Sequence, residues 1–255
     1  MKIILSLSAI LITLTLTAQS NIATWYLNNT SGTGIQSPTS VANGNYSTAM
    51  GYNAIADGLV STAMGYATIA SGYYSTSMGK NTIASGDVST VMGVGTTASD
   101  FGSTVIGQYN LLGSTVTNSA TAFNSTNTAF VIGNGNGGTR SDALTVLFDG
   151  TTTIAGNLSI NSDARLKANI ISLGSTLAKL LQIDGKTYTM KKDENKKQKI
   201  GVLAQDIEKV FPELVSESNG IKSVNYQGLV PVLINALKEQ DSKMNEQEAR
   251  IERLE

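Results

Sequence analysis

Apolar and polar residues alternate over short stretches in the first part of the chain, and the same stretch returns every 14 residues. Eight-residue units begin at Gly44, Gly58, Gly72, Gly86 and Asp100, and they read GNYSTAMG, GLVSTAMG, GYYSTSMG, GDVSTVMG and DFGSTVIG. Strict alternation is typical of β-strands, and self-similarity at a fixed period is typical of stacked coils that each bury a face against the next. The pattern predicts a β-roll with two short strands per coil.

Three columns of residues keep this register from coil to coil. The glycines are expected at corners that need unusual backbone angles. Alternation puts Thr48 and Met50 on one face of the first strand, and Ser47 and Ala49 on the other, so that one face fills the roll. We interpret the methionine column as packing and not as a cofactor site. The columns are Gly51, Gly65, Gly79, Gly93 and Gly107; Ser47, Ser61, Ser75, Ser89 and Ser103; and Ala56, Ala70, Ala84 and Ala98.

The repeat, G-x-x-S-x-A-x-G-x-x-A-x-A-x, resembles the head repeats of trimeric autotransporter adhesins. The resemblance covers about residues 42–113. It implies a left-handed parallel β-roll, with three chains side by side. Because a fold does not fix a function, the head could bind a host or surface ligand or could serve only as a spacer.

Residues 114–161 lose the repeat but keep strand-like patterns at Ala129–Ile132, Leu144–Phe148 and Thr152–Ile154. The glycine-rich run Gly133–Gly138 is interpreted as a turn and not as a phosphate loop, because no GK[ST] and no basic cluster follow it. We interpret this segment as a β-stalk between the head and the rest of the chain.

From residue 162 onward the pattern is mixed. A hairpin is predicted from Lys186–Met190 and Lys199–Ala204, and a short helix over Ala204–Phe211 is expected to end at Pro212. A long helix is expected to begin near Gln227. This part therefore reads as a small α+β domain with a C-terminal helix.

A heptad pattern runs along this last helix over about residues 228–255. A single helix would leave the apolar stripe in water, so the pattern predicts a coiled coil, with Lys243 and Glu248 on flanking positions suited to an interchain pair. Three-fold symmetry would serve both this helix and the head repeats, so we expect a homotrimer. The two core positions hold Val230, Leu237, Met244 and Ile251, and Leu233, Gln240, Gln247 and Leu254.

Composition changes at the same boundary. Residues 20–161 hold two basic and five acidic residues, whereas residues 162–255 hold 15 basic and 14 acidic ones. The net charge of −1 gives no electrostatic reason to expect nucleic acid as a partner. The chain has no His and no Cys, which removes the usual zinc ligands and any Ser-His or Cys-His pair. No cofactor or metal is expected, and any covalent chemistry needs a Ser or Thr nucleophile.

Residues 1–18 have the pattern of a secretion signal. Lys2 precedes an apolar stretch over Ile3–Leu16, which is shorter than the roughly 20 residues that a membrane-spanning helix needs. Small residues follow, so we expect cleavage after Ala18. The mature chain is then expected to be secreted or on the cell surface, with no membrane span.

Three blocks carry a second resemblance: SDARLKANI at Ser162–Ile170, IGVLAQDIEKVFPELV at Ile200–Val215 and VNYQGLVPVLINALKEQ at Val224–Gln240. With them, Ser162–Glu255 resembles the C-terminal intramolecular chaperone domain of endosialidase-type phage tailspikes. That family trimerises, helps the upstream β-structure to fold, and then cuts itself off before the serine of its S-D-x-R-x-K motif.

The resemblance implies a scissile bond between Asn161 and Ser162, with Ser162 as nucleophile and Lys167 as general base. Serine needs a base to remove its proton, and only a neutral amine can accept one, so burial or a nearby cation such as Arg165 would favour the reaction. Ser162 could attack the carbonyl of Asn161 through a small ring and form an ester that water cleaves. The activity would be that of a single-turnover autoproteolytic serine endopeptidase.

Two simpler interpretations stand beside this one. Ser162 and Asp163 could cap a helix that carries a solvated Lys167, and residues five apart do not share a helix face. The chain could also be a non-enzymatic trimeric adhesin or stalk that keeps its C-terminal domain as a permanent clamp. A phage tail fibre is disfavoured by the predicted signal peptide. The two downstream blocks favour self-cleavage.

The predicted protein is thus mainly β and trimeric. Its expected parts are a signal peptide (1–18), an N-terminal segment (19–41), the head repeats (42–113), the β-stalk (114–161) and the chaperone and autoprotease domain (162–255).

Overall fold

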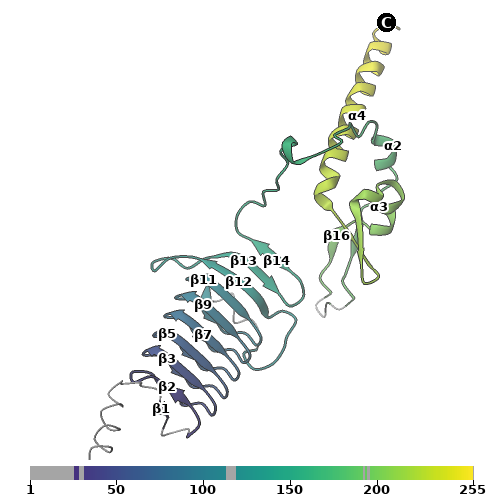
Figure 1. Ribbon diagram of the computed structural model, residues 1–255. Coiled ribbons are helices and arrows are strands. Elements are labelled where there is room, and N and C mark those ends of the chain that lie inside the picture. The colour runs from purple at the N-terminus through teal and green to yellow at the C-terminus, as the bar shows by residue number, and fades with distance from the viewer. Residues whose placement is uncertain (1–25, 29–31, 113–118, 192, 194–195, 255) are drawn as a thin grey trace, which may run out of the picture. The chain divides into compact units, whose positions relative to one another are not determined.

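The computed structural model describes residues 26–28, 32–112, 119–191, 193 and 196–254. The predicted signal peptide lies outside these residues. The chain divides into two compact units, of which the first ends at Ser159 and the second begins at Ile160 (Figure 1). Over the described ranges, none of the helices has the length and apolar character needed to span a bilayer.

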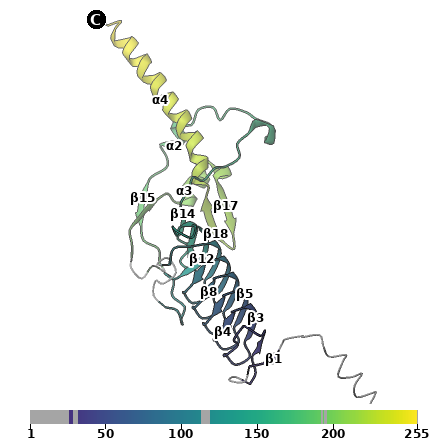
Figure 2. The same cartoon turned by 90° about the vertical axis from the view of Figure 1, so that its left-hand side faces the viewer.

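The first unit is a β-solenoid of parallel coils, as the repeat predicts. Each 14-residue coil gives a five-residue strand to one sheet, and each coil except the last also gives a two-residue strand to a second sheet. Equivalent residues pair from coil to coil (Figures 1 and 2). The long strands are β3 (Thr48–Tyr52), β5 (Thr62–Tyr66), β7 (Thr76–Lys80), β9 (Thr90–Val94) and β11 (Thr104–Gln108), and the short strands are β4 (Ile55–Ala56), β6 (Ile69–Ala70), β8 (Ile83–Ala84) and β10 (Thr97–Ala98).

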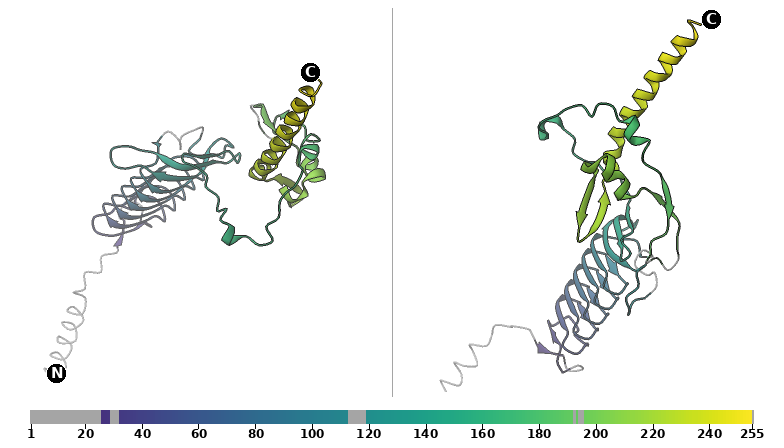
Figure 3. Two further views of the ribbon diagram at one scale, coloured as in Figure 1. Left: turned by 90° about the horizontal axis from the view of Figure 1, so that it is seen from above. Right: turned by 90° about the vertical axis from the view of Figure 1, so that its right-hand side faces the viewer.

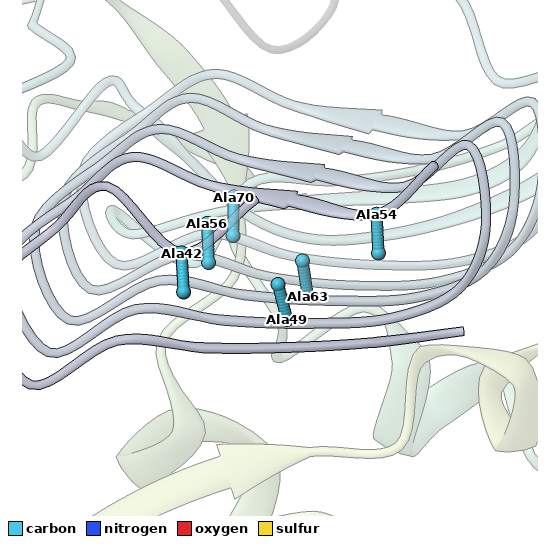
Figure 4. Close-up of a cluster of buried hydrophobic side chains, with 6 residues drawn as sticks. All are labelled: Ala42, Ala49, Ala54, Ala56, Ala63 and Ala70. Atoms are coloured by element: carbon cyan, nitrogen blue, oxygen red, sulfur yellow. The ribbon is translucent and has the colours of Figure 1, made fainter. Parts of the chain in front are cut away.

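Small side chains fill the interior of the solenoid. Ser47 and Ala49 point inward, whereas Thr48 and Met50 lie on the outer face and are half-buried. The methionine column therefore packs along the outside of the coils. Figure 4 shows how closely the alanines of the two sheets face each other. This cluster contains Ala42, Ala49, Ala54, Ala56, Ala63 and Ala70, all fully buried.

Close backbone approach at the corners explains the glycine columns. Gly79 has a φ of +117°, and a Cβ built on it would lie 2.1 Å from the carbonyl oxygen of Gly93. Residues beside the other corner also take positive φ, including the β-branched Val60 at 54°. Its N–H donates to the carbonyl of Asn45 in the previous coil at 2.8 Å, so a hydrogen bond between coils offsets the strain.

The last coil is closed by side chains that replace a missing strand. The Asn110 amide donates to the Thr97 carbonyl at 3.0 Å and accepts from the Thr97 N–H at 2.8 Å, which satisfies the edge of the second sheet. Asp100 stands where earlier coils have glycine, and its carboxylate accepts from the Thr128 N–H at 2.7 Å. This bond fixes the start of the strand that continues the large sheet.

Three strands extend the large sheet beyond the repeats. The first pairs parallel with β11, and the next two follow in antiparallel order, close to the strands predicted there. Two short strands cover the opposite edge of the same sheet. The added strands are β1 (Tyr26–Leu27), β2 (Ile35–Gln36), β12 (Thr128–Asn134), β13 (Asp142–Leu147) and β14 (Thr152–Ile154).

The second unit is a small α+β fold with two hairpins and a long C-terminal helix. The predicted hairpin and short helix are confirmed, and a second hairpin was missed. Its turn is Asn219–Gly220, with both residues at positive φ as a two-residue hairpin turn requires. The elements are α2 (Leu177–Leu180), β15 (Lys186–Tyr188), β16 (Lys199–Gly201), α3 (Ala204–Val210), η3 (Pro212–Leu214), β17 (Val215–Ser218), β18 (Ile221–Val224), η4 (Tyr226–Gly228) and α4 (Leu229–Ile251).

Helix α4 carries apolar residues on two different faces. Val232 and Ala236 are buried, on the face of α4 that packs against the rest of the second unit. The core of this unit also holds Ile207 and Phe211. The heptad positions lie on another face and remain exposed, with Leu237 at 72%. The helix therefore completes its own unit with one stripe and leaves a second stripe uncovered.

We predict that Gly79→Ala disrupts the solenoid. Overpacking against the next coil and backbone strain each cost about 1 to 3 kcal/mol, so the variant is expected to lose about 3 kcal/mol of unfolding free energy or to lose the coil altogether. Urea unfolding followed by far-ultraviolet circular dichroism measures the change. Gly156→Ala is the matched control, because a Cβ there meets open space. A Gly79→Ala chain with the wild-type midpoint would contradict the prediction.

Candidate active site

The residues predicted to cleave the chain lie in an open segment at the start of the second unit. In both views of Figure 3, the chain after β14 is a largely extended ribbon interrupted by one short turn. That turn is the 3-10 helix η2 (Ala164–Leu166), with Ser162 just before it and Lys167 at its end. Residues 160–175 are all exposed to solvent.

The η2 turn brings the two candidate residues together. The Asp163 carboxylate caps it by accepting the N–H of Arg165 at 2.9 Å, and the Lys167 N–H closes it on the carbonyl of Ala164 at 3.1 Å. Lys167 then turns back, and its Nζ donates to the Ser162 Oγ at 2.7 Å. A spacing of five residues is unsuited to an α-helix but works across one tight turn that is followed by extended backbone.

Asp163 and Arg165 form an ion pair beside the two residues. The Arg165 Nη2 lies 2.6 Å from the Asp163 Oδ2, and both groups are well exposed. The guanidinium side chain, together with the Arg165 N–H, holds the pKa of Asp163 below its usual value, and the carboxylate raises the pKa of Arg165. The positive charge of Arg165 is therefore paired with the Asp163 carboxylate. The sequence had suggested that this charge favours the neutral form of Lys167, and the ion pair weakens that effect.

The Ser162–Lys167 contact and its surroundings define what the pair can do here. At 2.7 Å, the serine hydroxyl lies within reach of the lysine amine. A lysine can act as a general base only in its neutral form, which has a lone pair to accept the hydroxyl proton. The two side chains have the geometry of a nucleophile and a base. Both are exposed to water, so the burial that favours a neutral amine is absent.

A carboxylate that the sequence interpretation missed ties the following segment to α4. Glu239 accepts the N–H groups of Thr176 and Leu177, the latter at 3.1 Å, and the hydroxyl of Ser175 at 2.7 Å. These bonds, with the hydroxyl of Ser175 foremost, hold the pKa of Glu239 below its usual value. No local pattern signals this contact, because more than 60 residues separate the partners in sequence.

Two further bonds reinforce this attachment. The Thr176 hydroxyl donates to the carbonyl of Val232 at 2.8 Å, and the Asn235 amide donates to the carbonyl of Gly174 at 3.2 Å. The chain beyond Lys167 is therefore anchored on α4 from residue 174, whereas residues 162–173 are exposed. The candidate site lies on a short tether whose far end is fixed to the helix with the uncovered stripe.

The glycine-rich run Gly133–Gly138 forms a turn, as predicted, and not a phosphate loop. The Asn136 side-chain oxygen accepts the N–H groups of Gly138 and Thr139, each at 2.9 Å, so these donors are not available to a phosphate. Across the part of the chain that the structure describes, no group of three or more acidic side chains is placed to hold a metal ion.

Comparison with known proteins confirms both resemblances. Residues 162–216 match the family model described as chaperone of endosialidase. Stretches between residues 38 and 110 match the model of the YadA head domain repeat. The first match begins at Ser162, and the second spans the solenoid coils.

The chain is also similar to part of several phage long tail fiber proteins named Gp37. The protein of Salmonella phage S16 is 29% identical over 108 residues, which are 38% of this chain and 14% of that protein. The proteins of Escherichia phage AR1 (29% over 100 residues) and Enterobacteria phage T2 (30% over 105 residues) are matched over 9% and 8% of their lengths. The matched part of this chain therefore corresponds to a small portion of each relative. The chain combines adhesin-like repeats with a chaperone-like region.

We predict that the anchor at Glu239 weakens in acid. A carboxylate whose pKa is lowered by folding stabilises the folded state above its unfolded pKa of about 4.3, and this contribution is lost as the pH falls through the folded value. Hydrogen-exchange protection factors of the Thr176 and Leu177 amides are expected to drop below about pH 4. Glu239→Gln should lower them already at neutral pH, whereas Glu246→Gln, on an exposed part of α4, should not. Unchanged protection in Glu239→Gln would disprove the anchor.

Proposed function

We propose that residues 162–255 act as an intramolecular chaperone for a trimeric, extracellular, tail-fibre-like or adhesin-like protein, and then release themselves by cutting the Asn161–Ser162 bond. Ser162 is the nucleophile and Lys167 is the general base. The observation that carries the proposal is the 2.7 Å contact between their side chains at the first residue of the chaperone-like region. The mature product is then residues 19–161.

Assembly is proposed to occur through the uncovered stripe of α4. Val230, Leu233 and Leu237 are each at least half exposed, although the face of α4 that holds Val232 is already buried in its own unit. An apolar heptad stripe of this kind is stabilised by packing against copies of itself. Three copies fit both this helix and the head repeats, and they would bring three solenoids together in register.

Assembly also supplies what the candidate site lacks. Leu166, Ile170 and Ile171 surround Lys167 in sequence and expose 66% of their surface or more. Packing of this apolar segment against another copy would remove water from the Lys167 amine and favour its neutral form. Cleavage would then follow trimerisation and would not precede it.

The chemistry proceeds through an ester. Neutral Lys167 takes the hydroxyl proton of Ser162, and the Ser162 Oγ bonds to the carbonyl carbon of Asn161 through a small ring. The bond from that carbon to the Ser162 nitrogen breaks, and the nitrogen receives the proton. A second nucleophile then cleaves the ester and leaves Ser162 as the first residue of the released fragment.

One observation favours a second candidate function. Ser162 and Lys167 both lie on an exposed turn, as surface residues without a catalytic role would. In this alternative the chain is a trimeric adhesin or stalk without enzymatic activity, and residues 162–255 stay attached as a permanent clamp. In both functions the solenoid presents a surface to a host or other external ligand.

Intact-mass measurement of the full chain tests self-cleavage. We expect the wild-type protein to yield a 94-residue fragment, 162–255, that begins at Ser162. The fragment should be absent from Ser162→Ala and Lys167→Ala, because each removes one partner of the proposed pair. Ser159→Ala is the control, since it removes a nearby exposed hydroxyl that has no role here. A wild-type chain that stays whole and trimeric would sink the proposal in favour of the clamp.

Trimerisation through α4 has its own test. Leu237→Asp places a charge on the exposed stripe and is expected to give monomers in sedimentation equilibrium and to abolish release of the fragment. Ser242→Asp adds the same charge on the opposite side of the helix, outside the heptad core, and should leave the trimer intact. Trimers that survive Leu237→Asp would place the assembly surface elsewhere.

A further inference from the structure

The residue before the proposed scissile bond is an asparagine, and cleavage by water makes no use of its side chain. Asn161 is exposed, lies outside any helix or strand, and directly precedes Ser162. The amide nitrogen of an asparagine closes a five-membered ring when it attacks its own carbonyl carbon. The Ser162 hydroxyl reaches that same carbon through a ring of equal size.

We propose that Asn161 is a further catalytic residue, and that its side-chain amide, not water, resolves the ester on Ser162. This inference rests on the proposed self-cleavage. It assigns to the upstream product a C-terminal succinimide in place of a free carboxylate.

The atoms balance in two steps. In the first, the Ser162 Oγ bonds to the carbonyl carbon of Asn161, the C–N bond to Ser162 breaks, and Lys167 carries the hydroxyl proton to that nitrogen. In the second, the Asn161 Nδ2 bonds to the same carbon, and the C–O bond to the Ser162 Oγ breaks. Nδ2 loses one proton and Oγ gains one. The upstream product is therefore one water lighter than the hydrolysis product.

The observed contact places the Lys167 amine beside the oxygen that leaves in the second step. After the ester forms, the Ser162 Oγ is the leaving group and must receive a proton. The Lys167 Nζ already lies 2.7 Å from that oxygen, within the reach that proton transfer requires. The first step leaves Lys167 neutral again, so in the second step its amine can take the proton that the Asn161 Nδ2 loses and deliver it to the Ser162 Oγ.

Tethering favours the amide over water once the site is covered. A nucleophile held on the reacting residue gains an effective molarity that can reach about 10⁵ M, whereas burial of the site in a trimer lowers access for water. Asn161 has no place in a sheet ladder or a helix, so no regular backbone pairing opposes the bend that ring closure needs.

Cell-free translation of the full chain, quenched in acid at early times, tests the inference. Arg140 is the last basic residue before Asn161, so trypsin releases residues 141–161 as the C-terminal peptide of the upstream product. In the wild type we expect this peptide to be one water lighter than the acid. Later it should become a mixture that ends in asparagine and in aspartic acid α-amide, because water opens the imide at either carbonyl.

Asn161→Ala and Asn161→Gln are the informative variants. Alanine has no amide, and glutamine would need a slower six-membered ring. Both should give only the free acid and should release residues 162–255 about tenfold more slowly, because a tethered nucleophile has been lost. A wild-type peptide that carries only the acid, with asparagine as its only end, would overturn the role of Asn161 even where Ser162→Ala blocks cleavage.

The two proposals fail in different ways. If the wild type forms no fragment at all, self-cleavage fails, and the role of Asn161 fails with it. If the fragment forms, depends on Ser162 and arises at the wild-type rate in Asn161→Ala, self-cleavage stands and only the role of Asn161 is lost. An imide that still forms in Ser162→Ala would support Asn161 as the direct nucleophile and would remove Ser162 from the mechanism.

Discussion

Backbone hydrogen bonding between successive coils is the constraint on which the first unit depends. The coils approach so closely that a Cβ at Gly79 would meet the carbonyl of Gly93 at 2.1 Å, and only glycine fits there. The interior is filled by small and medium side chains, namely alanine, serine, threonine and valine. Little apolar surface is available in such a narrow core, so each coil owes its stability to the hydrogen-bonded ladder above and below it.

A ladder of nearly identical coils specifies its own register weakly. A slip by one whole coil would place Ala63 where Ala49 was, and Gly65 where Gly51 was, with the same pairing. Within one chain the unique closures at Asp100 and Asn110 oppose such a slip. Between chains, the repeats contain no comparable feature that would fix the register of one solenoid against another. A C-terminal region that aligns three copies would supply it, which gives a physical reason for a solenoid to be followed by an assembly domain.

The periodic features were predictable, because they depend on spacing alone. The coils, their glycine corners and the exposed stripe of α4 all follow from repeats of 14 and seven. The sequence pattern did not predict which face of each strand points inward, because alternation defines two faces but not the width of the interior. The contact of Ser162 with Lys167 depends on a turn capped by Asp163, and that of Glu239 on a fold-level approach between distant segments. Neither has a periodic signal.

The contact between Ser162 and Lys167 connects the proposed self-cleavage with the proposed assembly through α4. In the structure the Ser162 and Lys167 side chains are exposed and lie 2.7 Å apart. In the proposed trimer, packing through α4 would change the surroundings of this pair, because residues 174–177 are fixed to that helix and the η2 turn precedes them. In the proposed self-cleavage, the contacts made by α4 leave with residues 162–255. The proposed trimer would then persist through slow unfolding of its solenoids and not through the interactions that assembled it.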